Sequence, residues 1–116
     1  MFIEKRPVIY IGYDSTQDEA YHVCKASIER YAKNHTIKPL VLSELKDEGL
    51  YWRPYQNEST EFAFTRFLVP YLSMYQGCAL FCDSDFMWKC DPQEIVEVTD
   101  TDHDVYCVKH PQFLVP

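Results

Sequence analysis

Two aspartates separated by one serine follow an apolar run in the second half of the sequence. The run, residues 78–82, has the composition of a buried strand, and Asp83, Ser84 and Asp85 come directly after it. Side chains of an extended segment alternate between two faces, so both carboxylates are expected on one side and Ser84 on the other. Two carboxylates at this spacing can bind one divalent cation, Mg²⁺ or Mn²⁺, that keeps open positions for phosphate oxygens. The triplet therefore predicts a metal site that could anchor a nucleotide diphosphate.

The same triplet has a plainer interpretation as a turn. Asp and Ser bond their own backbone and tolerate tight turns, and Asp-x-Asp is common by chance. The cysteines offer no stronger metal site, because the spacing of Cys78, Cys82 and Cys90 matches no usual zinc pattern. The surrounding elements therefore decide between a metal site and a turn.

Composition and charge fit a small globular protein and exclude some partners. The chain has 116 residues, 47% of them hydrophobic, and its 18 acidic residues against 11 Lys and Arg give a formal charge of −7. Nucleic acid is not expected as a partner, because binding a phosphate backbone needs a concentrated basic patch. A cation held by acidic side chains would instead allow this acidic chain to bind an anionic nucleotide.

Other features of the sequence bear on the compartment. No stretch approaches the roughly 20 apolar residues of a membrane span, and the N-terminus does not have the order of a secretory signal. The five cysteines are an odd number and most have apolar neighbours, which favours free thiols over a disulfide framework. We therefore expect a cytoplasmic protein without a membrane span.

Strand-like and helix-like segments alternate along the chain. Apolar runs predict the strands, and apolar side chains at helical spacing after a capping residue (Ser15, Thr16 or Asp18) predict the first helix. In chain order we expect a strand at 8–13, a helix at 18–34, a strand at 37–42, a loop with one helical turn at 43–55, a helix from 59 or 60 to about 72 that Pro70 kinks or ends, a strand at 78–82, a short helix from Asp91-Pro92 and a strand at 105–108. The buried face of the first helix is expected to hold Ala20, Val23, Cys24, Ser27, Ile28 and Tyr31. This order indicates an α/β fold with a mainly parallel sheet flanked by helices, formed by residues 1–116 as one domain.

Several segments in one order resemble glycosyltransferases of the GT-A fold, most closely family 8 and its relatives. An Arg-containing helix that ends in Pro (65–72), a strand that ends in Asp-x-Asp (78–85) and an acidic turn into a short helix (91–92) have the family's order and spacing. Residues 9–14, followed by a helix, are similar to the family's first strand and nucleotide loop. The resemblance covers most of the chain and implies a Rossmann-like half that binds a nucleotide-sugar donor.

The resemblance also assigns roles to the aspartate triplet. Asp83 and Asp85 correspond to the catalytic pair that binds the metal and the donor diphosphate. Asp85 would chelate most directly, while Asp83 would share the metal and contact the donor ribose. Ser84 belongs to the same donor-binding triplet.

Four more residues match donor-binding positions of the family. Gly12, Tyr13 and Asp14 fall where the first-strand loop holds the base and ribose, at the carboxyl end of a strand, where ligands of parallel sheets bind. Arg66 falls where an arginine approaches the sugar or diphosphate, and guanidinium geometry suits phosphate oxygens. Each also has a structural interpretation: a strand end, a core tyrosine, a helix-entry aspartate and a surface cation.

The implied activity is transfer of a sugar from a UDP-sugar to a glycan or another acceptor. Mn²⁺ or Mg²⁺ would stabilise the charge on the departing diphosphate. A complete enzyme of this family is longer and adds a third metal ligand, often His, and the acceptor-binding residues. We therefore expect the chain to be the donor-binding part of such an enzyme, cut short, inactive in isolation and able to associate through the face that the missing half would cover.

Two other functions fit the same residues. In phosphatases of the haloacid dehalogenase type an Asp-x-Asp pair also follows an apolar strand, and Asp83 would be the nucleophile and Asp85 the general acid. That motif usually lies on the first strand, whereas here it comes late in the chain. The other alternative is a non-catalytic, split or degenerate α/β module that works by associating with another chain.

Overall fold

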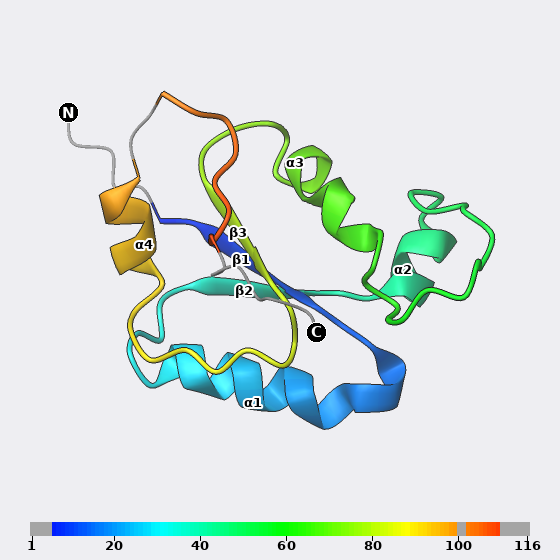
Figure 1. Ribbon diagram of the computed structural model, residues 1–116, viewed down its shortest axis with the longest axis horizontal. Coiled ribbons are helices and arrows are strands. Elements are labelled where there is room, and N and C mark those ends of the chain that lie inside the picture. Colours follow the sequence, from blue (N-terminus) through cyan, green and yellow to red (C-terminus); the bar gives the residue numbers. More distant parts are fainter. Residues whose placement is uncertain (1–5, 100–101, 110–116) are drawn as a thin grey trace, which may run out of the picture.

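Three parallel strands form one sheet with helices on both faces in the computed structural model, which describes residues 6–99 and 102–109 (Figure 1). The strands are β1 (Val8–Gly12), β2 (Thr36–Leu40) and β3 (Ala79–Cys82), in the order β2-β1-β3. The helical elements are η1 (Ser15–Gln17), α1 (Asp18–Glu29), α2 (Leu42–Asp47), η2 (Thr65–Leu68), α3 (Val69–Leu72) and α4 (Gln93–Val98). The predicted α/β class, with a parallel sheet flanked by helices, is confirmed.

Strand β1 lies at the centre of the sheet and is buried on both faces. Ile9 and Ile11 pack with the buried side of α1, whereas Tyr10 packs with Leu40 and with Val69 of α3. Because successive side chains of a strand point to opposite faces, a strand covered on both sides must be apolar at nearly every position. This explains why residues 8–13 are a continuous apolar run, and the strand predicted there is confirmed.

Helix α1 begins where the sequence predicts but ends earlier, at Glu29. Its buried face contains Tyr21, and the predicted core residues Val23 and Tyr31 are exposed. None of the three predicted residues caps α1, since its N-cap is Gln17, without a side-chain hydrogen bond. The 3-10 turn η1 precedes the helix, and the N–H of Thr16 in this turn donates to the side chain of Asp14. The predicted face is confirmed at Cys24, Ser27 and Ile28 and wrong at Val23 and Tyr31, and the predictions of length and cap were wrong.

The chain between β2 and β3 differs most from the prediction. The helical turn expected within 43–55 is present as α2, but no continuous helix runs from 59 to 72, because residues 59–64 form turns before η2 and α3. Pro70 lies in the first turn of α3, where its missing N–H is not needed, so it helps to begin a helix and does not end one. The helix after Asp91-Pro92 is confirmed as α4.

The strand predicted at 105–108 is wrong. Residues 102–109 form no strand, and Val105 and Val108 are exposed. A strand needs a neighbouring strand with free backbone N–H and C=O groups, which a short apolar run does not itself provide.

Among the residues that the structure describes, no helix has both the length and the apolar composition of a membrane span.

Candidate functional site

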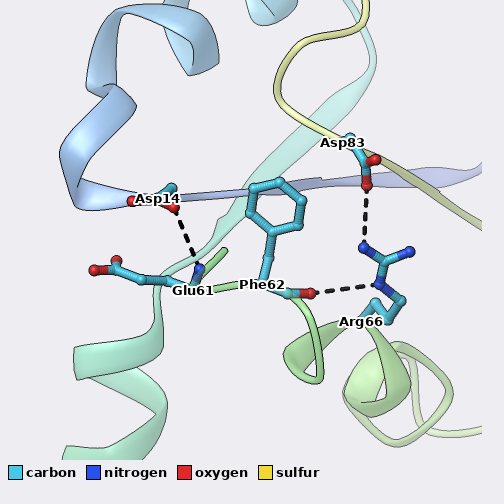
Figure 2. Close-up of polar contacts among 5 residues, drawn as sticks. All are labelled: Asp14, Glu61, Phe62, Arg66 and Asp83. Atoms are coloured by element: carbon cyan, nitrogen blue, oxygen red, sulfur yellow. Dashed lines mark hydrogen bonds and ion pairs between the residues drawn. The ribbon is translucent and has the colours of Figure 1, made fainter. Parts of the chain in front are cut away.

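The candidate site lies at the carboxyl ends of β1 and β3. Strands β2 and β3 lie on opposite sides of β1, so the strand order reverses between β1 and β3. In open parallel sheets, ligands bind in the crevice outside such a reversal. Residues 61–66, here called the bridging segment, connect the two strand ends through polar contacts to Asp14 and Asp83 (Figure 2).

Gly12 is the last residue of β1, and the ring of Phe62 occupies the space where a side chain would be. A Cβ atom built on Gly12 would lie 2.5 Å from Cγ of Phe62 and 2.6 Å from Cδ2, closer than real Cβ contacts come. The glycine is therefore required by close packing of the bridging segment on the strand. The predicted contact of Gly12 with a donor stays a prediction beside this packing role.

Asp14 is a buried carboxylate held by backbone and side-chain donors. It is 5% exposed, and it accepts hydrogen bonds from the N–H (2.9 Å) and Oγ1 (2.6 Å) of Thr16 and from the N–H of Glu61 (3.3 Å). Burial raises the pKa of Asp14, but the three hydrogen bonds outweigh burial and hold its pKa below the ordinary value. Asp14 is thus a helix-entry residue that caps η1 and fastens the bridging segment.

Tyr13 turns toward α1. Its hydroxyl donates to Oδ1 of Asp18 at 2.6 Å, and its ring packs edge-on against Tyr21 with 5.7 Å between centroids. The hydrogen bond to Asp18, with burial and the charges of Asp18 and Glu61, raises the pKa of Tyr13. The contacts of Tyr13 match the structural interpretation, and contact with a base or ribose stays a prediction.

The aspartate triplet forms a turn directly after β3. The strand ends at Cys82, and the N–H of Phe86 bonds to the carbonyl of Asp83 at 3.2 Å. The expectation of an extended segment through Asp85 is therefore wrong, because the backbone reverses one residue after the strand. Ser84 is 2% exposed, while Asp83 is half-buried and Asp85 is exposed, and the predicted position of both carboxylates on one side stays a prediction.

Arg66 contacts Asp83. Its Nη2 lies 3.3 Å from Oδ1 of Asp83, and the two side chains are 37% and 38% exposed. Its Nε donates to the carbonyl oxygen of Phe62 at 3.4 Å, and its guanidinium carbon lies 5.0 Å from the ring centroid of Phe81. The structure thus brings together two residues that the sequence analysis had assigned separately to donor binding.

The donor set of the triplet suits a hard divalent cation that shares its coordination with a ligand. Asp83 and Asp85 offer carboxylate oxygens, the ligands that Mg²⁺ and Mn²⁺ prefer. No group of three or more His, Cys, Asp and Glu side chains suited to a metal occurs in the part of the chain that the structure describes. Mg²⁺ commonly needs just one or two carboxylates when waters and phosphate oxygens complete its shell, so the pair fits such a cation.

A hollow of about 240 Å³ beside Asp14 was missed by the sequence analysis. Aromatic side chains of Tyr51, Tyr55 and Phe64 line it, and the guanidinium of Arg53 lies 4.1 Å from the centroid of the Phe64 ring. The density of aromatic residues in a segment without regular structure could have indicated this site, because loops held by a rigid scaffold commonly carry function.

The fold and the candidate site define a small α/β protein with carboxylates beyond the carboxyl ends of two parallel strands. The chain is similar to Protein CDI from Arabidopsis thaliana, with 46% identity over 110 residues. The match takes in 92% of this chain and 42% of the relative, so the chain spans less than half of the relative's length. No family model and no solved structure match the chain.

Proposed function

We propose that this chain is the donor-binding part of a metal-dependent glycosyltransferase that uses a UDP-sugar. The observation that carries the proposal is the position of Asp83 and Asp85 at the carboxyl end of β3, beside the reversal of strand order, with Arg66 in contact with Asp83. A metal-bound diphosphate needs hard oxygen ligands and a nearby guanidinium, and this edge offers both. In this proposal the sheet is the Rossmann-like half of a GT-A fold.

Different residues of the chain would bind the metal ion, the diphosphate and the base of the donor. Asp83 and Asp85 would hold Mn²⁺ or Mg²⁺, and Arg66 would donate to phosphate oxygens. The cation, when bound, supplies Lewis-acid stabilisation of the charge on the departing diphosphate. The hollow beside Asp14 offers aromatic walls to the planar base, which agrees with the predicted role of the first-strand loop. The acceptor, a glycan or another hydroxyl compound, would be selected by residues of a longer protein.

The phosphatase alternative has less support. Asp83 follows β3, the third strand in the chain and an edge strand of the described sheet, and its carboxylate contacts Arg66. In that type of phosphatase the nucleophilic aspartate usually follows the first strand, so the position of Asp83 after the third strand does not match.

The non-catalytic module has one favourable observation. Large side chains of η2, α3 and the residues after them are exposed, namely Phe67, Tyr71, Met74 and Tyr75. Exposed apolar side chains gathered along one segment are typical of association surfaces. Association through this surface is compatible with donor binding, because it would join the chain to an acceptor-binding part.

The five free cysteines suit a reducing compartment, and we propose the cytoplasm.

Calorimetry with UDP, in the presence and absence of Mn²⁺, tests the proposed function. We expect UDP to bind at least tenfold more tightly with Mn²⁺, and we expect Asp85→Asn to abolish that difference, since one of the two carboxylates is lost. The matched control is Asp47→Asn, which removes an exposed carboxylate at the end of α2. Equal affinity for UDP with and without Mn²⁺ would contradict the proposal.

A further inference from the structure

The two carboxylates of the triplet, Asp83 and Asp85, differ in their bonding partners. Asp83 has a cationic partner, Arg66, at 3.3 Å. Asp85 is exposed and makes no hydrogen bond or ion pair with the described residues. A cation that binds both carboxylates therefore finds Asp85 without a partner in the described part of the chain, whereas Asp83 already has the positive charge of Arg66 beside it.

The position of Arg66 is fixed by its surroundings as well as by Asp83. The carbonyl oxygen of Phe62 accepts from its Nε, and the rings of Phe81 and Phe62 lie 5.0 and 5.9 Å from its guanidinium carbon. Phe62 is in turn packed on Gly12. Because these contacts do not involve Asp83, the guanidinium can stay at the site when the carboxylate turns to another partner.

We propose that Arg66 is a resting counter-ion of Asp83, which competes with the divalent cation for this carboxylate and passes to the donor's diphosphate when the cation is bound. This inference rests on the proposed function. Two cations next to one carboxylate repel each other, so metal alone binds weakly. A diphosphate brings the negative charge that both cations need, so metal and nucleotide bind cooperatively. Arg66 thus links the two binding events.

The competition predicts effects of opposite sign in one variant. Arg66→Gln removes the competing charge, so Mn²⁺ alone should bind about threefold to tenfold more tightly, a range set by the screening of half-exposed charges. The same substitution removes a donor to the diphosphate, so UDP should bind about tenfold more weakly when Mn²⁺ is saturating. A residue that merely supported the local structure would weaken both interactions.

The experiment measures free and bound Mn²⁺ by electron paramagnetic resonance, and UDP binding by calorimetry, in the wild type and three variants. Arg66→Gln is the test, and Arg66→Lys keeps the charge but loses the planar fork, so its Mn²⁺ affinity should stay near that of the wild type. The control Arg30→Gln removes the same charge at the C-terminal end of α1 and should change neither affinity. Circular dichroism establishes that each variant is folded.

The outcomes separate this inference from the proposed function. Tighter Mn²⁺ binding and weaker UDP binding in Arg66→Gln would support the competition. Unchanged or weaker Mn²⁺ binding in Arg66→Gln, or tighter binding in Arg66→Lys, would overturn it while Mn²⁺-dependent UDP binding stands. Absence of Mn²⁺ binding in every protein, with and without UDP, would overturn the proposed function itself.

Discussion

Strands β1 and β3 are each followed closely by an aspartate at the same edge of the sheet, yet the two carboxylates have different surroundings. Asp14 is 5% exposed and accepts three hydrogen bonds from the chain itself. Asp83 is 38% exposed and contacts one charged side chain, that of Arg66. A carboxylate whose lone pairs are taken by backbone and side-chain donors of its own chain stabilises the fold, whereas a carboxylate with free lone pairs can bind a ligand. Residue type and strand position alone do not separate these two roles.

The largest expected effect comes from breaking the packing at the end of β1. Gly12→Ala should lower the free energy of unfolding by about 3 kcal/mol, because its Cβ would overlap the ring of Phe62. The control is Gly77→Ala, where φ is +70° and the space for a Cβ is open, so the expected loss is about 1 kcal/mol from backbone strain. Urea unfolding of the variants measures both values. Equal losses would mean that Phe62 moves aside readily and does not fix the bridging segment.

The second-largest expected effect is the difference in stability between substitutions of Asp14 and of Asp83. Asp14→Ala should lower the free energy of unfolding by about 2 kcal/mol, because it removes the cap of η1 and the hydrogen bond that fastens the N–H of Glu61. Asp83→Ala should change it by less than about 0.5 kcal/mol, as a half-exposed ion pair is screened by water. A larger loss for Asp83→Ala than for Asp14→Ala would reverse the assigned roles.

The stabilising effect of Asp14 should also depend on pH. Its pKa in the folded protein lies below the unfolded value, which is about 3.9 for Asp. The ionised carboxylate therefore stabilises the fold fully above that unfolded value, and the stabilisation is lost as pH falls through the lower, folded pKa. The difference in stability between wild type and Asp14→Asn should accordingly stay constant from pH 7 to about 5 and shrink below about pH 4. A difference that grows in acid would contradict the hydrogen-bonding pattern.

The central strand could be predicted from the sequence, and the bridging segment could not. Residues 8–12 must be apolar because both faces are covered, so the run itself encodes the strand. The segment 59–72 has helical spacing, but Phe62 packs on Gly12, and the tertiary contact overrides the helical preference. The contact between Arg66 and Asp83 depends on that irregular path, which no local pattern describes.

The cysteines give a second example of what spacing alone cannot reveal. Cys24 and Cys82 are far apart in the sequence, but their sulfur atoms lie 3.7 Å apart where α1 packs on β3. The sequence correctly indicated free, buried thiols, which is what the structure has at these two positions. Their proximity follows from the strand order, which the alternation of elements does not fix.

The most direct test of the central claim is an NMR titration with Mg²⁺ in the presence of UDP, which compares the ends of β1 and β3. If Asp83 and Asp85 hold the cation, the backbone amides of Ser84 and Phe86 should shift as Mg²⁺ is added. The amides of Thr16 and Glu61, bonded to Asp14, should respond to UDP alone or not at all. A titration in which Mg²⁺ shifts Thr16 and Glu61 and leaves Ser84 and Phe86 unchanged would contradict a metal site at the end of β3.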